Sequence, residues 1–296
     1  METLTGDAWM GRLAPRPPTP PPPTESKAGR NLPAAIATAL GLLGAVVLAL
    51  FVWIDLFVVI VAAFIVVGLW EAAGAFSTRG FYIPIVPAWI ATAGLVLSTR
   101  FFGELGLLIS FFYGALLVIA WRFRAGGQWA ARDCAAGLFA LSWIGLLGGF
   151  AILLAGMDNG AWAVITFIIL PVASDTGGYF AGVLLGKHPM APTISPKKSW
   201  EGFGGSIVLA MIAGTVCAHF ALDISWWWGI ILGIACTIAG TAGDLSESLL
   251  KRDLGVKDMG SIFPGHGGVL DRVDSILVCA PVVYILLLAA TTGLST

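Results

Sequence analysis

The sequence predicts an all-α fold: a polytopic membrane bundle of about nine transmembrane helices. Of the 296 residues, 58% are hydrophobic and only 11% are charged, whereas a soluble domain carries about 25% charged residues. Apolar stretches long enough to cross the hydrocarbon core, which takes about 20 helical residues, follow one another from residue 33 to residue 293. The net charge is −1 and no segment forms a basic domain, so a nucleic-acid-binding function is excluded.

Residues 1–31 differ from the rest of the chain. They are polar and rich in proline, with an unbroken run of proline at residues 20–23. Proline has no backbone N–H and does not continue a helix or a sheet ladder, so this segment is predicted to be a disordered cytoplasmic tail. Residues 32–296 are predicted to form the transmembrane domain, with its catalytic part at residues 171–275.

The helices are placed by hydropathy in the order of the chain. Asp55 lies in a tight joint between the first two, and Pro171 is expected to kink the sixth, which neighbouring helices in a bundle tolerate. Trp226, Trp227 and Trp228 open the eighth helix as an interfacial anchor, because indole rings prefer the headgroup zone. The nine helices occupy residues 33–51, 55–76, 82–98, 103–121, 134–156, 160–182, 204–222, 226–243 and 274–293.

The lysines and arginines orient this bundle. With nine helices, every lysine and arginine except Arg100 falls on the same side as the N-terminus. The positive-inside rule makes that side cytoplasmic, so the segments at residues 186–203 and 244–273 both face the cytoplasm. Glu71, at the cytoplasmic end of the second helix, is interpreted as a solvated helix end, and His219 as a structural histidine. The four cysteines lie in or beside apolar segments at no metal-ligand spacing, so neither a disulfide nor a zinc site is predicted.

The stretch from Ser248 to Asp274 breaks the apolar pattern, because it places eight charged side chains between two membrane-grade segments. Such a loop is costly beside a membrane unless it faces water and does chemistry. Asp244, Ser248 and Lys251 share one face of a continuing helix by their spacing, and Asp271 and Asp274 share a face at the start of the last helix.

Carboxylates from these two helix ends predict a site for a hard divalent cation. Mg²⁺ prefers one or two carboxylates together with phosphate oxygens and water. Taken alone, each aspartate would more often be a helix cap or a surface charge, and it is the joint pattern that favours a metal.

The glycine-rich turn at residues 264–268 is typical of a phosphate site, because glycine lets backbone N–H groups approach an anion closely. His266 within the turn either donates to a phosphate or only holds the turn. Asp175, inside the sixth helix, either lines a pocket or serves helix packing. The basic side chains of the stretch can neutralise a triphosphate or attract anionic headgroups; they are Lys251, Arg252, Lys257 and Arg272.

The same stretch resembles the signature of the phosphatidate cytidylyltransferases, the CDP-diacylglycerol synthases. The matching positions are Ser248, Lys251, Arg252, Lys257, Asp258, Pro264, His266, Gly267, Gly268, Asp271, Arg272 and Asp274. A second block, from Ser195 to Gly202, also resembles that family. The first half of the chain resembles it only in being a stack of apolar helices.

The resemblance implies a nucleotidyltransferase that passes CMP from CTP to phosphatidic acid, giving CDP-diacylglycerol and pyrophosphate for phospholipid biosynthesis. It implies a multi-pass protein of the inner (plasma) membrane, in contact with membrane lipids, a homodimer, and Mg²⁺ as cofactor, and it leaves open a monovalent cation such as K⁺. Asp244 and Asp271 are then expected as the metal ligands, and as catalytic residues together with Asp274, Lys251 and Arg272. Substrate binding is assigned to Ser248, Arg252, Lys257, Asp258, His266, Gly267, Gly268, Ser195, Lys197, Lys198, Glu201 and Asp175.

Two other functions compete with this interpretation. A related enzyme that activates another lipid phosphate with CTP would share the C-terminal signature and differ in its lipid groove. A transporter would place ionisable residues or broken helices near the membrane midplane in both halves. Here the charge gathers in the cytoplasmic loops of the C-terminal half, which favours an enzyme.

Overall fold

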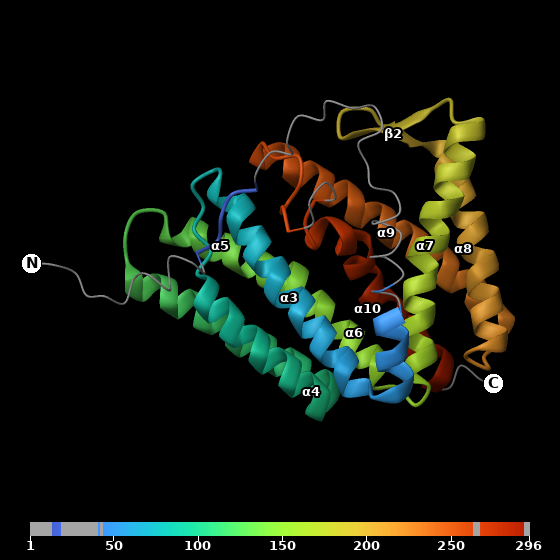
Figure 1. Cartoon of the computed structure of the whole chain (residues 1–296), viewed down its shortest axis with the longest axis horizontal. Helices are drawn as coiled ribbons and strands as arrows, with labels where there is room; N and C mark the ends of the chain where they lie inside the picture. The colour runs from blue at the N-terminus through green and yellow to red at the C-terminus, as the bar shows by residue number, and fades with distance from the viewer. Residues whose placement is uncertain (1–13, 19–40, 42–43, 263–266, 293–296) are drawn as a thin grey trace, which may run out of the picture.

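The computed structural model describes residues 14–18, 41, 44–262 and 267–292. Within this part of the chain, seven helices are long and apolar enough to cross a membrane. The protein is therefore a polytopic helical membrane protein, as its composition predicts (Figure 1). The helices are α3 (Ile54–Ser77), α4 (Ile85–Ala125), the continuous run of α5 (Ala130–Ala140), η1 (Leu141–Leu146) and α6 (Leu147–Ala155), then α7 (Gly160–Leu185), α8 (Trp200–Phe220), α9 (Trp226–Leu254) and α10 (Leu270–Thr292).

Helix α4 is folded back on itself at Gly103. This residue has φ 60° and ψ −138°, a conformation open to glycine because it has no Cβ. A Cβ on Gly106 would collide with the carbonyl oxygen of Ser98, and one on Gly114 would lie 2.8 Å from the Cβ of Ala91. In a straight helix Ala91 and Gly114 would lie about 35 Å apart. Because they are in contact, the two halves of α4 run antiparallel.

This hairpin accounts for two of the predicted helices, 82–98 and 103–121, within one element. The other predictions from residue 55 onwards each have a counterpart among the described helices. Of the first predicted helix, 33–51, residues 41 and 44–51 are helical and lead towards α3, whereas residues 33–40, 42 and 43 lie outside the described residues. The predicted tail also lies mostly outside them; of its described part, the backbone of Arg16 lies against Gly74 of α3.

A short antiparallel sheet joins α7 to α8, where only a loop is predicted. Strand β1 (Pro189–Ala191) pairs with β2 (Ser195–Ser199). The Ser199 side chain accepts a hydrogen bond from the N–H of Gly202 at 3.1 Å and so caps the start of α8, as serine at this position commonly does. In Figure 1 this hairpin extends sideways from the ends of α7 and α8.

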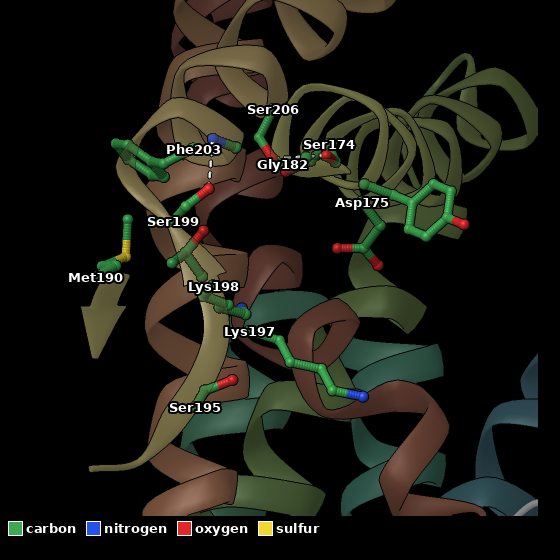
Figure 2. A pocket seen from close by; sticks show the side chains of 14 residues that line it. Ser174, Asp175, Gly182, Met190, Ser195, Lys197, Lys198, Ser199, Phe203 and Ser206 are labelled. Atoms are coloured by element: carbon green, nitrogen blue, oxygen red, sulfur yellow. Dashed lines mark hydrogen bonds between the residues drawn. The ribbon is translucent and has the colours of Figure 1, made fainter. Parts of the chain in front are cut away.

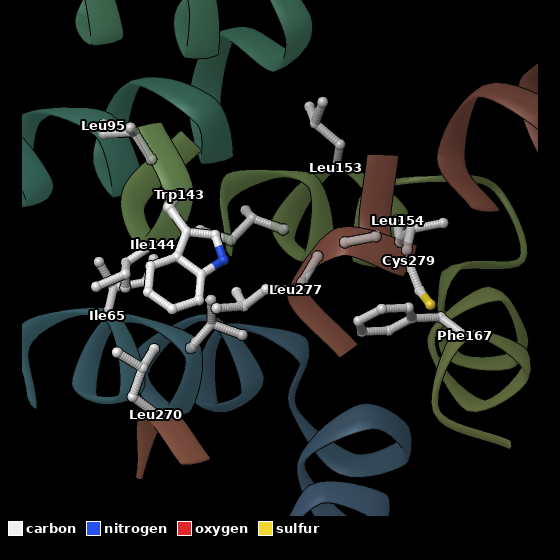
Figure 3. Close-up of a cluster of buried hydrophobic side chains, with 14 of the residues drawn as sticks. Ile65, Leu95, Trp143, Ile144, Leu153, Leu154, Phe167, Leu270, Leu277 and Cys279 are labelled. Atoms are coloured by element: carbon white, nitrogen blue, oxygen red, sulfur yellow. The ribbon is translucent and has the colours of Figure 1, made fainter. Parts of the chain in front are cut away.

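The core lies where α3, η1, α6 and α10 meet. Ile65, Ile144 and Leu277 pack there in one buried cluster (Figure 3). Close van der Waals packing, rather than the exclusion of water, holds helices together in lipid. Small residues serve the same purpose between α7, α8 and α9: a side chain on Gly177 would collide with the backbone of α8, and one on Gly214 with that of α9.

The basic loops meet at one end of the bundle. Arg79, after α3, donates to the carbonyl of Asp253 at 3.0 Å, and Arg252, on α9, donates to the carbonyl of Ile194 in the β-hairpin at 2.7 Å. Arg100 lies in the α4 hairpin, where its guanidinium pairs with Asp55 at 2.6 Å. The hydrogen bond from Arg252 to Ile194 holds the segments around residues 186–199 and 251–262 side by side. The site described next lies between them.

Candidate active site

Three carboxylates gather where α9 and α10 cross. One oxygen from each of Asp244, Glu247 and Asp274 lies within 4.8 Å of the other two. Asp244 and Glu247 share a face of α9 because they are three residues apart, and Asp274 reaches them from α10. Gly243 lets the helices approach, since a Cβ there would lie 3.1 Å from the carbonyl oxygen of Asp274.

This cluster fits a divalent cation. Glu247 and Asp274 are only 1% and 8% exposed, so water does little to stabilise their negative charge. Among the contacts of the described residues, Glu247 Oε1 is buried without a hydrogen-bond partner. A buried polar atom left without a partner is unfavourable by about 1–3 kcal/mol or more. A hard cation bound by oxygen ligands would supply the missing interaction.

Lys251 connects the cluster to the segment between α9 and α10, here called the signature loop, which the structure describes at residues 255–262 and 267–269. Its ammonium group lies 2.9 Å from Glu247 Oε2 and 2.9 Å from Asp271 Oδ1. The Asp271 carboxylate also accepts hydrogen bonds from the backbone N–H groups of Met259 and Gly268, each at 2.9 Å to Oδ2. Asp271 therefore fixes the loop and Lys251, while the oxygens that converge come from Asp244, Glu247 and Asp274.

A cavity of about 310 Å³ opens beside the acidic cluster, between α7, β2 and α8. Asp175 of α7 lines it, as do Lys197 and Lys198 of β2 (Figure 2). Lys198 also pairs with Asp244 of the cluster. Lys198 thus links the cavity, whose charged lining is Asp175, Lys197 and Lys198, to the acidic cluster beside it.

The remaining predicted site residues lie around the cavity and the acidic cluster, except one that is outside the described residues. Glu201 accepts from the N–H groups of Lys187 and His188 at 3.1 and 3.2 Å, so it closes the loop before α8. Ser195 lines the cavity. Ser248 and Arg252 lie on α9, and Arg252 donates a hydrogen bond to the β-hairpin. Lys257 and Asp258 lie in the loop after α9. Arg272 follows Asp271 on α10. His266 is outside the described residues, whereas Gly267 and Gly268 lie at the start of the segment that leads into α10.

The sequence analysis did not predict the positions of two acidic residues, Glu247 and Glu71. Glu247 joins the cluster, and its spacing of three from Asp244 is the signal that could have found it. Glu71, interpreted as a solvated helix end, is 1% exposed, so that interpretation was wrong. It is buried because the segment around Gly260 and Gly268 folds over it, a contact that no local pattern predicts.

A model of the cytidylyltransferase family matches residues 33–290. The chain belongs to this family. Among its cytidylyltransferase relatives, the phosphatidate cytidylyltransferase of Mycobacterium bovis is 39% identical over 301 residues, which cover 96% of this chain and 98% of the relative. That of Mycobacterium leprae is 39% identical over 277 residues, covering 88% and 89% of the two chains. That of Staphylococcus saprophyticus is 35% identical over 175 residues, covering 59% and 66%. The predicted resemblance is confirmed.

Proposed function

We propose that this protein transfers CMP from CTP to phosphatidic acid, giving CDP-diacylglycerol and pyrophosphate. The family match and the names of the relatives support this reaction. The observation in the structure that carries it is the ion pair between Lys198 and Asp244. That pair joins a cavity whose two lysines suit phosphate groups to a largely buried acidic cluster, which suits the cation that accompanies a nucleoside triphosphate.

The reaction is a displacement at phosphorus. An oxygen of the lipid phosphate forms a bond to the α-phosphorus of CTP, and the bond from that phosphorus to the bridging oxygen of the β-phosphate breaks. Pyrophosphate leaves with the bonding electrons. The attacking phosphate is already anionic, so the protein supplies positioning and charge neutralisation more than a general base. Lys197 and Lys198 would hold phosphate oxygens in the cavity, and Arg272 would do so from the start of α10.

We include Mg²⁺ in the proposal, because the acidic cluster offers the oxygen donors that this ion prefers. Asp244, Glu247 and Asp274 would hold it. Bound there, it would neutralise negative charge on the phosphate oxygens. Asp271, expected from the sequence as a ligand, would not touch the ion in this arrangement. It would instead hold Lys251 and the loop beside the cluster. A monovalent cation such as K⁺ stays a prediction of the family resemblance.

The activity test uses the purified protein in mixed micelles with phosphatidic acid and Mg²⁺. CTP labelled at the α-phosphate is expected to carry its label into the organic phase, and CTP labelled at the γ-phosphate is expected to release its label as pyrophosphate. Micelles that hold a prenyl phosphate instead are the matched control. Transfer to the prenyl phosphate but not to phosphatidic acid would contradict the proposed acceptor, and no transfer to either lipid would contradict the enzyme.

We also propose that the site faces the cytoplasm of a cell whose inner membrane holds the protein as a homodimer. In a variant whose four buried native cysteines are replaced, Lys257→Cys is expected to react with an impermeant thiol reagent only in inverted vesicles. Asp158→Cys, in the exposed turn before α7, is the control and is expected to react only in intact spheroplasts. The reverse labelling would contradict the proposed orientation, and chemical cross-linking in native membranes would test the dimer.

A further inference from the structure

Glu71 ties the N-terminal half of the chain to the start of α10. Its two carboxylate oxygens accept hydrogen bonds from the N–H groups of Val269 at 3.0 Å and Leu270 at 2.9 Å. Val269 directly precedes α10 and Leu270 is its first residue, and the N–H groups at the start of a helix have no partner within it. A carboxylate there is favoured both by the hydrogen bonds and by the helix dipole. Glu71, on α3, therefore acts as the cap of a helix about two hundred residues away.

The signature loop is shaped around this carboxylate. A Cβ on Gly260 would lie 2.7 Å from the Cγ of Glu71, and one on Gly268 would lie 2.6 Å from its Cδ. Real Cβ atoms essentially never come so close to another heavy atom, so neither position accepts a side chain while Glu71 is in place. The two glycines thus leave room for Glu71, in addition to any role in phosphate binding.

Glu71 and Asp271 hold the same loop from two sides. Glu71 binds the N–H groups of Val269 and Leu270, while Asp271 binds those of Met259 and Gly268. One turn further along α10 lies Asp274, whose carboxylate completes the acidic cluster. A shift of the α10 start by about 1 Å would misplace that carboxylate, and misplacements of this size can slow a reaction about a hundredfold.

We propose that Glu71 is a positioning residue of the active site: by capping α10 from α3, it sets the place of Asp274 against Asp244 and Glu247. This inference rests on the proposed function, because it assumes that the cluster serves the reaction. The competing role is general stability of the fold. The two roles differ in what they affect, since a positioning residue changes turnover in a protein that stays folded.

Glu71→Gln is the informative variant, because it keeps the size of the side chain and removes one of its two acceptors. The amide NH₂ would then face a backbone N–H, so one hydrogen bond to the start of α10 is lost. We expect kcat to fall about tenfold to a hundredfold, because a displaced start of α10 misplaces the Asp274 carboxylate. KM for CTP is expected to stay within about twofold. The thermal midpoint in detergent is expected to fall by the loss of one hydrogen bond, with the protein still folded at the assay temperature.

Glu104→Gln is the matched control. Glu104 is also a carboxylate on a membrane helix, and it accepts from the hydroxyl of Tyr284 at 2.5 Å, away from the acidic cluster. Its replacement is expected to leave kcat unchanged. If Glu71→Gln kept kcat within twofold of the wild type, or lost activity only in proportion to lost folded protein, the positioning role would be overturned. Either result would leave the proposed function standing, because the wild type would still make the product.

A double-mutant cycle tests the contact without any assay of activity. Gly260→Ala is expected to lower the thermal midpoint strongly in the wild type, because the new methyl group overlaps the Glu71 side chain. In a Glu71→Ala background the same replacement is expected to have little effect, since the space is vacated. Such non-additivity is the signature of direct contact. Additive effects would overturn the inference even if the enzyme assay gave no signal.

Discussion

Asp244→Asn and Asp274→Asn are each expected to lower kcat by at least about a hundredfold. Each change keeps the shape of the side chain and removes a negative charge from the cluster, where one oxygen of each carboxylate lies within 4.8 Å of the others. Charge stabilisation by a bound metal contributes several kcal/mol to such reactions, and about 2.7 kcal/mol corresponds to a hundredfold in rate. Glu247→Gln is expected to behave in the same way, because its Oε1 is buried and has no hydrogen-bond partner among the described residues.

The measurement is kcat at saturating CTP and phosphatidic acid over a range of Mg²⁺ concentrations. Asp253→Asn is the control, since Asp253 lies exposed near the end of α9 and only its backbone carbonyl makes the contact with Arg79. Isothermal titration of Mg²⁺ gives a second readout, in which the three cluster variants are expected to bind the ion more weakly than the control. Near-normal turnover of any one variant at every Mg²⁺ concentration would remove that residue from the ligand set.

Asp271→Asn tests whether Asp271 is a metal ligand or a partner of Lys251 and the loop backbone. If Asp271 were a ligand, as the sequence predicts, the variant would match Asp244→Asn in its Mg²⁺ affinity. In the structure its oxygens instead receive Lys251 and the N–H groups of Met259 and Gly268. The geometry therefore favours a variant that binds Mg²⁺ about as well as the wild type, with a less stable signature loop that proteases cleave more readily.

Hydropathy and charge were enough to predict the helices described from residue 54 onwards, because each signal is local. Even the α4 hairpin could be predicted as two helices, since Arg100 and Glu104 bracket Gly103 and interrupt the apolar run. The same holds for the candidate site at the level of segments: Asp244 and Asp274 lie on helix ends that do converge. Long apolar runs and clustered charge are constrained by the bilayer, whatever the neighbours are.

Individual roles within the site could not be predicted in this way. Glu71 and Leu270 are about two hundred residues apart, and only the packing of α3 against the loop brings them together. Asp271 and Asp274 share a face of α10 by their spacing, yet the first points to the loop backbone and the second to the cluster. The direction of a short side chain at a helix end depends on which donors the loop presents, and a single sequence does not encode that locally.

Lys251→Met is the second change with a large expected effect, because it leaves two carboxylates without their shared cation. The ammonium lies 2.9 Å from both Glu247 and Asp271, and the Glu247 side chain is fully buried. Removing one partner of a buried ion pair costs about 3–5 kcal/mol. We expect a clear drop in the thermal midpoint and a loss of at least about a hundredfold in kcat. Arg124→Met, at the exposed end of α4, removes a positive charge at the surface and is expected to change neither.

A role of Lys251 in direct contact with CTP gives a different result. A lost phosphate contact would raise KM for CTP and leave the unliganded protein as stable as before, since the contact exists only with substrate bound. Loss of the bridge instead destabilises the protein before any substrate arrives. The double variant Lys251→Met with Glu247→Gln decides between them, because it removes the uncompensated charge on Glu247 together with the lysine. We expect its thermal midpoint to recover most of the loss, as neutral replacements of buried ion pairs often do, while kcat stays low because the cluster has lost a carboxylate. A double variant no more stable than Lys251→Met alone would contradict the bridge and favour contact with the nucleotide.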